Sequence, residues 1–426
     1  MTTPAGPRGE DRSPARAGRH RRLRTVLAVI AAVCAVVVAG VVGFRLVRSA
    51  GSSQPAADHP AAGPGATGPA GSGSASPSPA RPTAPALPAL SPAQLAGQRV
   101  IYSYGGLTPP GQLLRWIRAG KVAGVIFFGG NISSPSQLAG VVAELDRANA
   151  SPRNPLHHYP LLLMTDQEGG LVRRLPGAPE LSEKEIGEAL HPAAAAKDAG
   201  RGAGRNLASI GLNVNLAPVL DVYRAPGDFD DQFGRSYSAS GRQVSRLGAS
   251  FIAAQQATGV AATAKHFPGL GAADASQNTD ERPVTLDVPL RVLRGTDEYP
   301  YRAAIQARVK LVMVSWAVYP ALDPRAPAGL SAKVVGELRQ RLGFTGVTIT
   351  DALEAGALQA YGATRRRATL AAGAGMDLIL CSAQQAAQGN QARVALSEDY
   401  QQGKLNRAAF RTAVQRVLAL RSSLRG

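Results

Sequence analysis

The sequence predicts an α/β protein built as a single (β/α)8 barrel behind an N-terminal membrane anchor and a linker. Seven short apolar runs alternate with helix-like segments from residue 91 onward, and an eighth run is plausible. Short apolar strands separated by helices are typical of a parallel sheet buried on both faces. Polar residues directly follow several of these runs, as in barrels whose chemistry lies at the carboxyl ends of the strands. An open, doubly wound sheet is the alternative that this pattern leaves open.

Residues 1–44 have the composition of a membrane anchor. Residues 1–24 carry seven arginines against Glu10 and Asp11, and residues 25–44 contain no charged side chain. A helix of about 20 residues spans about 30 Å, the thickness of a bilayer's hydrocarbon core. The arginine-rich segment is expected to stay in the cytoplasm, so residues 25–44 cross the membrane once and the rest of the chain is extracellular. The alternative is a cleaved signal peptide and a secreted domain.

Residues 45–90 are predicted to be a linker. Within residues 51–90, alanine, proline, glycine and serine supply 32 of the 40 positions, a composition that cannot offset the entropy of ordering. Of the net charge of +18, about +11 remains on residues 91–426, where it suits an anionic cell envelope; no nucleic-acid-binding motif occurs. Two cysteines without metal-ligand spacing predict neither a disulfide framework nor a metal, and no cofactor is expected.

The predicted strands and helices follow one another along residues 91–426, which are expected to form the barrel domain. The predicted strands are Val122–Phe128, Pro160–Thr165, Val214–Val222, Val260–Ala264, Leu311–Val314, Val347–Thr350 and Asp377–Leu380, with Arg99–Tyr104 as the plausible eighth. The helix-like segments between them include Glu183–Ile210, Ser240–Thr258, Ser331–Leu342, Arg365–Ala372 and Ala383–Gln401.

Polar side chains at the strand ends predict a shared pocket. They are Asp166 with Glu168, Asp221, Lys265 with His266, Trp316 and Asp351. Any one of them could cap a helix or lie on the surface, but their recurrence favours a common site. No glycine-rich phosphate-binding motif opens a helix, so the sequence does not support nucleotide chemistry.

Five motifs carry a resemblance to a known family. TDQEGGLVRRL, NLAPVLDV, GRSYS, AKHFPGLG and ITDALEAGAL occur in the order and spacing of family 3 glycoside hydrolases. Over about residues 92–426 the chain resembles single-domain bacterial β-N-acetylglucosaminidases that act on peptidoglycan fragments. The resemblance implies a monomeric glycosidase that takes a cell-wall glycan as its partner and releases a terminal β-linked sugar, N-acetylglucosamine.

The resemblance also implies roles for individual residues. Asp351 matches the nucleophile, which must be ionised to form a covalent glycosyl-enzyme. Five further positions match residues that hold the hydroxyls of the terminal sugar: Asp166, Arg174, Arg235, Lys265 and His266.

One loop departs from the family pattern. Members of this group carry Asp-Ser-His there, and the His serves as general acid and base, but this chain has Ser276, Gln277 and Asn278. Asp280 is our first candidate for the missing acid and base, ahead of Asp274 and Glu281. The alternatives are a membrane-tethered, non-catalytic glycan-binding protein, and a glycosidase or transglycosylase of different β-glycoside specificity. A second departure is Trp316, where relatives often have His.

Overall fold

The computed structural model describes residues 87–424. The predicted cytoplasmic segment (1–24) and membrane anchor (25–44) lie outside the described residues, as does the predicted linker up to residue 86. None of the helices formed by residues 87–424 has the length and apolarity that a membrane span requires.

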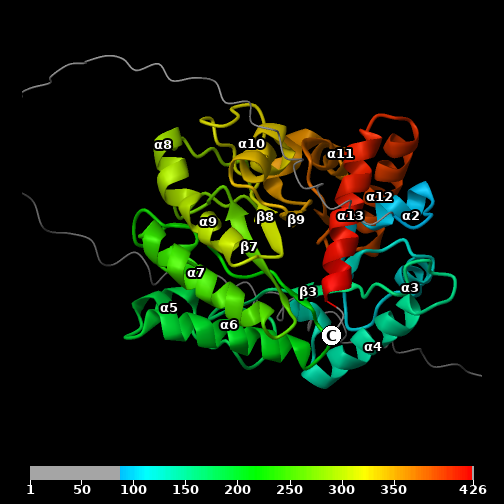
Figure 1. Ribbon diagram of the computed structural model, residues 1–426, viewed down its shortest axis with the longest axis horizontal. Helices are drawn as coiled ribbons and strands as arrows, with labels where there is room; N and C mark the ends of the chain where they lie inside the picture. Colours follow the sequence, from blue (N-terminus) through cyan, green and yellow to red (C-terminus); the bar gives the residue numbers. More distant parts are fainter. Residues whose placement is uncertain (1–86, 425–426) are drawn as a thin grey trace, which may run out of the picture. The chain divides into compact units, whose positions relative to one another are not determined.

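The core of the domain is a barrel of eight parallel strands that are paired in chain order (Figure 1). Strand β10 pairs with β1, and a parallel bridge from Ile349 to Leu378 joins β9 to the start of β10, so the sheet closes on itself. This closure confirms the predicted α/β barrel and excludes the open sheet. The strands are β1 (Val100–Tyr102), β2 (Gly124–Ile126), β3 (Leu162–Thr165), β6 (Val214–Asn215), β7 (Ala261–Phe267), β8 (Leu311–Val314), β9 (Val347–Thr350) and β10 (Ile379–Leu380).

Helices lie around these strands, and a small hairpin, β4 (Gln167–Gly169) with β5 (Val172–Arg173), follows β3. The helices are α2 (Pro92–Gly97), α3 (Gly111–Arg118), α4 (Pro135–Asn149), α5 (Glu183–Glu188), α6 (Pro192–Ala208), α7 (Gly241–Gln256), α8 (Leu290–Val292), α9 (Tyr299–Gln306), α10 (Ala332–Gly336), α11 (Thr364–Ala374), α12 (Ala386–Gln401) and α13 (Arg407–Ser423). Shorter turns are η1 (Gly129–Asn131), η2 (Asp231–Phe233), η3 (Leu293–Asp297), η4 (Ala328–Leu330), η5 (Glu337–Arg341) and η6 (Gly356–Tyr361).

The alternation of side chains along each strand divides the apolar residues between two cores. In β8, Leu311 and Met313 belong to the cluster inside the barrel, whereas Val312 and Val314 pack in the larger cluster with the helices. Successive strand residues point to opposite faces, so a continuous apolar run fills both cores at once. This double burial explains why the strands appear in the sequence as unbroken apolar runs.

Helix α13 contributes to the inner core. Its residues Val417 and Leu420 belong to the cluster inside the barrel, and Leu424 packs against that cluster. The buried Arg421 donates hydrogen bonds to the carbonyl oxygens of Pro160 (2.8 Å) and Tyr159 (2.8 Å), just before β3. The last helix is therefore fixed at the amino ends of the strands, opposite the end where the predicted polar residues lie.

Two predicted elements are interrupted by proline. The helix predicted over Glu183–Ile210 is two helices, α5 and α6, because Pro192 begins the second helix and has no N–H to continue the first. The strand predicted over Val214–Val222 keeps ladder pairing only at Val214–Asn215. Pro218 lacks an N–H in the remainder, which touches β7 through a bridge between Val219 and Lys265.

We expect Leu420→Ala to lower the free energy of unfolding by about 2–5 kcal/mol, because it removes buried methyl groups from the inner core and leaves a cavity. Urea denaturation of wild type and variant measures the change. Thr412→Ala, on the exposed side of the same helix, is the matched control and should change stability by less than about 0.5 kcal/mol. Equal stability of Leu420→Ala and wild type would show that α13 does not support the barrel core.

Candidate active site

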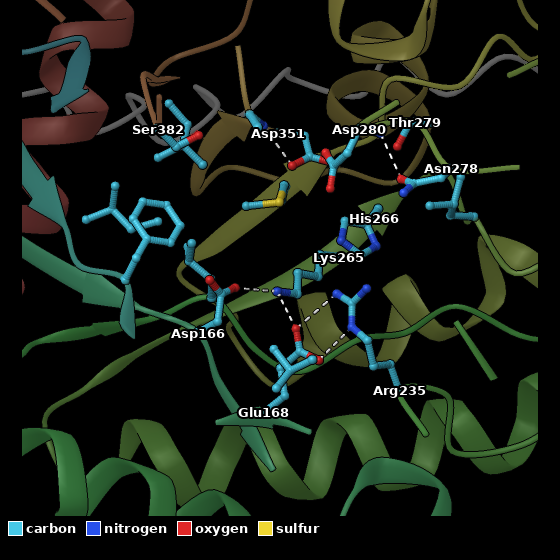
Figure 2. Close-up of a pocket in the computed structure, with 18 of the residues that line it drawn as sticks. Asp166, Glu168, Arg235, Lys265, His266, Asn278, Thr279, Asp280, Asp351 and Ser382 are labelled. Atoms are coloured by element: carbon cyan, nitrogen blue, oxygen red, sulfur yellow. Dashed lines mark hydrogen bonds and ion pairs between the residues drawn. The ribbon is translucent and has the colours of Figure 1, made fainter. Parts of the chain in front are cut away.

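A cavity of about 230 Å³ opens at the carboxyl ends of the strands. Its floor is the top of the inner core, including Leu216 and Met313. The seven residues given catalytic or sugar-binding roles from the sequence all line this cavity: Asp166, Arg174, Arg235, Lys265, His266, Asp280 and Asp351. Figure 2 labels all of them except Arg174. Asp221 and Trp316, which were also expected in a shared pocket, do not line it. Pockets for drug-sized ligands measure about 300–1,000 Å³, so this cavity suits a single small polar ring.

Glu168 joins a buried lysine and a partly buried arginine on one wall of the cavity. Lys265 Nζ lies 2.6 Å from Glu168 Oε1 and 2.8 Å from Asp166 Oδ1. Arg235 donates from Nε (2.9 Å) and Nη2 (3.0 Å) to the two oxygens of Glu168, and from Nη1 (2.9 Å) to Asp230. Glu168, Lys265 and Arg235 come from β4, β7 and the loop after η2. Their ion pairs therefore connect three parts of the chain (Figure 2).

These ion pairs also favour the ionised forms of Glu168 and Lys265. Burial disfavours ionisation of Glu168, but Arg235 and Lys265 outweigh it and lower the pKa of Glu168 to about 2. Burial also opposes the charge on Lys265, yet Asp166 and Glu168 raise the pKa of Lys265 above its usual value. A lysine ammonium has three N–H donors and a guanidinium has five. Both cations therefore keep donors that a ligand in the cavity can use.

His266 is held by a buried carboxylate behind the cavity. Its Nδ1 lies 2.7 Å from Asp221 Oδ2, so Nδ1 is the donor and Nε2 is left as an acceptor. Burial lowers the pKa of His266, although Asp230 and Asp351 oppose the shift. Burial raises the pKa of Asp221 to about 6, although the N–H of Leu270 donates to its Oδ1 at 2.6 Å.

Asp221, Asp230 and His266 are the one group in residues 87–424 that resembles a set of metal ligands, with one ligand atom from each within 4.8 Å of the others. However, both oxygens of Asp221 already accept N–H bonds, one of them from the His266 ring. A cation would have to displace these bonds, so we assign no metal there. Burial raises the pKa of Asp230 to about 7, and this carboxyl instead helps to hold Arg235.

Asp351 follows β9 and is positioned through the backbone of its neighbour. The N–H of Ala352 donates to Asp351 Oδ1 at 2.7 Å, and the Ala352 carbonyl accepts from Trp316 Nε1 at 2.8 Å. Trp316 is fully buried and does not line the cavity, so the sequence-based placement of this residue in the pocket is wrong. Its indole lies behind the site and fixes the peptide that bonds to Asp351.

The loop after β7 is attached to the loop after β9 by main-chain hydrogen bonds. Gly356 N–H donates to the Asp280 carbonyl (2.7 Å), and Ala357 N–H donates to the Thr279 carbonyl (3.0 Å). A Cβ on Gly356 would lie 2.1 Å from the Glu281 carbonyl oxygen, so the close approach requires glycine. These bonds place Asp280 beside Asp351, and Figure 2 shows the two carboxylates facing each other at one end of the cavity.

Only one of the three acidic candidates in this loop lines the cavity. Asp274 is exposed and accepts hydrogen bonds from Ser276, and Glu281 is exposed and pairs with Arg282. Asp280 is exposed on one side and lines the cavity on the other. The protein around its carboxyl limits contact with water, and this desolvation raises the pKa of the carboxyl. Arg235 opposes that shift and the charge on Glu354 adds to it.

Several residues of the site were given no role by the sequence analysis. Glu168 was recognised as a strand-end residue, but its bonds to Lys265 and Arg235 depend on contacts across 97 and 67 positions. Asp230 gave no signal, since its contact with Arg235 five positions later depends on the turn at η2 between them. Asn278 and Thr279 line the cavity because the loop is attached to the turn at Gly356.

Comparisons with known proteins identify the family to which this chain is similar. The family model described as "Glycosyl hydrolase family 3 N terminal domain" matches residues 99–420. An uncharacterized secreted glycosyl hydrolase of Arthroderma benhamiae is 45% identical over 344 residues, which cover 80% of this chain and 96% of that protein. A beta-hexosaminidase of Idiomarina loihiensis is 32% identical over 277 residues, 62% of this chain and 77% of the relative.

Two solved structures have the same fold. A glycoside hydrolase family 3 beta-N-acetylglucosaminidase from Paenibacillus superimposes with a TM-score of 0.74 at 34% identity, covering 79% of this chain and 64% of that chain. This chain therefore spans less than two thirds of that protein. A beta-N-acetylhexosaminidase from Beutenbergia cavernae superimposes with a TM-score of 0.71 at 33% identity, covering 78% of this chain and 99% of that chain.

The lowered pKa of Glu168 predicts a pH-dependent contribution to stability. A carboxyl with a folded-state pKa of about 2 stabilises the fold fully above its ordinary value of 4.5, and this stabilisation is lost as the pH falls from 4.5 towards 2. We expect Glu168→Gln to lower the free energy of unfolding at pH 7 by about 3 kcal/mol, because Lys265 and Arg235 each lose one of their two carboxylate partners. The difference from wild type should narrow below pH 4.5.

Chemical denaturation between pH 7 and pH 3.5 measures this difference. Glu180→Gln, an exposed carboxyl near the same hairpin, is the control and should behave as wild type at every pH. A deficit of Glu168→Gln that stays constant with pH would contradict the assigned ion pairs.

Proposed function

Since this chain belongs to glycosyl hydrolase family 3 and is a glycosidase, we propose that it removes a terminal β-linked N-acetylglucosamine from cell-wall-type glycans with retention of configuration. The observation that carries the proposed mechanism is the pairing of Asp351 and Asp280 at one end of a cavity whose other end is lined by cations (Figure 2). Two carboxyl groups that flank a glycosidic bond are the usual requirement for this reaction.

In the proposed reaction, Asp351 attacks the anomeric carbon and forms a covalent bond to the sugar. The bond between that carbon and the glycosidic oxygen breaks, and Asp280 donates its proton to the departing oxygen. A water molecule then attacks the anomeric carbon, gives a proton to Asp280 and releases Asp351. The enzyme returns to its starting state, and no other reactant is consumed.

The surroundings of the two carboxyls favour this division of roles. Burial raises the pKa of Asp351, but His266, Lys265 and the Ala352 N–H all favour its ionised form. The pKa of Asp280 is raised by loss of water and by the charges of Glu354, Asp166 and Glu281, while Arg235 opposes the shift. The two carboxyls interact, and the contacts that favour the ionised form of Asp351 favour placing a proton of the pair on Asp280.

The cavity supports removal of one terminal sugar. Lys265, Arg235 and Arg174 present donors, and Asp166 and the Nε2 of His266 present acceptors, which together can hold the hydroxyls of a single ring. The proposed N-acetylhexosamine specificity rests on the names of the relatives, which include a beta-hexosaminidase and a beta-N-acetylglucosaminidase. Membership of a hydrolase family favours a glycosidase over the non-catalytic alternative.

We further propose that the domain of residues 91–426 acts as a monomer outside the cell, where it takes part in peptidoglycan turnover. Residues 25–44 would attach it to the membrane through the linker 45–90, with cleavage and secretion as the alternative. The description of the Arthroderma benhamiae relative as secreted supports export.

Asp351→Asn should abolish more than about 99.9% of glycoside turnover, since an amide cannot form the glycosyl ester. The fold should be retained, because amide and carboxyl have nearly the same shape, and binding of the product sugar should persist. Release of nitrophenol from a nitrophenyl β-N-acetylglucosaminide measures turnover, and calorimetry measures binding. Turnover at the wild-type rate would exclude Asp351 as the nucleophile.

Asp280→Asn should separate substrates by the basicity of their leaving group. Nitrophenolate departs without protonation, whereas a sugar alkoxide needs an acid, so cleavage of a disaccharide should fall about 10²–10⁴-fold and the first step with the nitrophenyl glycoside much less. Steady-state and burst kinetics measure both rates. Asp274→Asn, in the same loop but outside the cavity, is the matched control. Equal losses on both substrates would make Asp280 a binding residue.

A further inference from the structure

A second cavity of about 230 Å³ lies at the opposite end of the barrel from the candidate active site. It adjoins Arg99, which directly precedes β1, Asp377, which precedes β10, and one side of α13, including Arg416. These positions are at the amino ends of the strands, whereas the proposed sugar site is at the carboxyl ends. A ligand bound here would therefore not compete with a glycoside.

Positively charged side chains outnumber negatively charged ones around this cavity. Three guanidinium groups, those of Arg99, Arg339 and Arg416, surround the single carboxylate of Asp377, which is fully buried. Arg416 Nη1 donates to Asp377 Oδ1 at 3.1 Å, Arg339 also pairs with Asp377, and Arg99 Nε donates to the Asp377 carbonyl at 3.1 Å. No second carboxylate acts on Arg99 or Arg339 in the part of the chain that is described.

The three arginines differ in how many of their donors are used. Arg339 serves the fold, since its Nη1 donates to the carbonyls of Phe344 (3.0 Å) and Gly346 (2.6 Å). In contrast, Nη1 of Arg99 and both Nε and Nη2 of Arg416 have no hydrogen-bond partner within residues 87–424. Arg99 and Arg416 both line the cavity, and each has N–H donors that are not used in holding the fold together.

Burial strengthens the attraction of this cluster for an anion. Arg99 is 2% exposed and one of its faces stacks on Phe410, with the guanidinium carbon 4.4 Å from the ring centre. Burial lowers the pKa of Arg99 to about 10, with Asp377 opposing the shift and Arg416 adding to it. A buried cation that lacks a full counter-charge is costly, and an anion that reaches it is bound strongly.

We propose that this cavity binds a tetrahedral oxyanion, inorganic phosphate or a phosphate monoester, between the guanidinium groups of Arg99 and Arg416. Guanidinium groups present parallel N–H donors that match the oxygens of phosphate, and the cavity is large enough for such an ion. Binding would join α13 to the segment before β1 and would stabilise the amino end of the barrel.

Thermal unfolding and calorimetry of the full chain test this proposal. Sodium phosphate is compared with sodium chloride at equal ionic strength, and glycerol 3-phosphate shows whether a monoester also binds. We expect phosphate to raise the Tm above its value in chloride. A comparable effect of glycerol 3-phosphate identifies a monoester site, and an effect of phosphate alone identifies a site for the free ion.

Arg416→Gln should weaken phosphate binding at least about tenfold, because it removes one of the two charged forks. Turnover of a nitrophenyl glycoside should be unchanged, which also shows that the variant folds. Arg416→Lys keeps a charge opposite Asp377 and should bind phosphate with intermediate affinity. Arg411→Gln, an exposed arginine on the same helix, is the control and should bind phosphate as wild type does. A Tm rise no larger than in chloride, or equal phosphate affinity of Arg416→Gln and wild type, would overturn the proposal.

Discussion

The candidate active-site pocket depends on the neutralisation of one buried carboxylate by a buried lysine and a partly buried arginine. Glu168 is 1% exposed and meets both Lys265 and Arg235. Charges taken out of water are tolerated only when they are paired and hydrogen-bonded, so removing any one of the three side chains leaves its partners with less counter-charge. Because the three come from separate segments, the network also sets the positions of the segments that carry them. Asp166 and Asp230, which share these cations, are held in the same way.

The carboxyl of Asp351, the proposed nucleophile, is held by different means, through the backbone. Ala352 accepts a hydrogen bond from the buried Trp316 on one side and donates one to Asp351 on the other. A rigid ring packed in the core thereby fixes a peptide group, and the peptide group fixes the carboxylate. The barrel supports this arrangement because its inner core extends up to the floor of the cavity. The packed inner core of the barrel thus directly supports the residues that line the cavity.

The barrel and the strand-end residues of the site could be predicted because both depend on local patterns, whereas Arg174 and Arg235 were expected only from the resemblance to family 3 glycoside hydrolases. Apolar runs such as Leu311–Val314 and Val347–Thr350 coincide with β8 and β9, since a strand buried on both faces needs apolar residues at every position. The polar residues at the strand ends were also identified from the sequence, because the carboxyl ends of parallel strands lie at the same end of a barrel. The partners of these residues were not predictable. Asp377 acts through ion pairs with Arg339 and Arg416, which form only after distant segments have folded. Asp230 lies five positions before Arg235, but their contact depends on the turn at η2. Trp316 was misplaced because its position after a strand does not reveal where the indole points.

The attachment of the loop after β7 to the turn at Gly356 has a consequence for how this site can diverge. Both hydrogen bonds use main-chain atoms, so this attachment does not depend on which side chains Thr279, Asp280 and Ala357 carry. Of Ser276, Gln277 and Asn278, Asn278 alone lines the cavity, and its Oδ1 accepts a hydrogen bond from the N–H of Asp280 at 2.9 Å. A substitution at Asn278 therefore removes a bond that supports the loop. A substitution at Asp280 changes the chemistry at this end of the cavity and leaves the main-chain attachment in place.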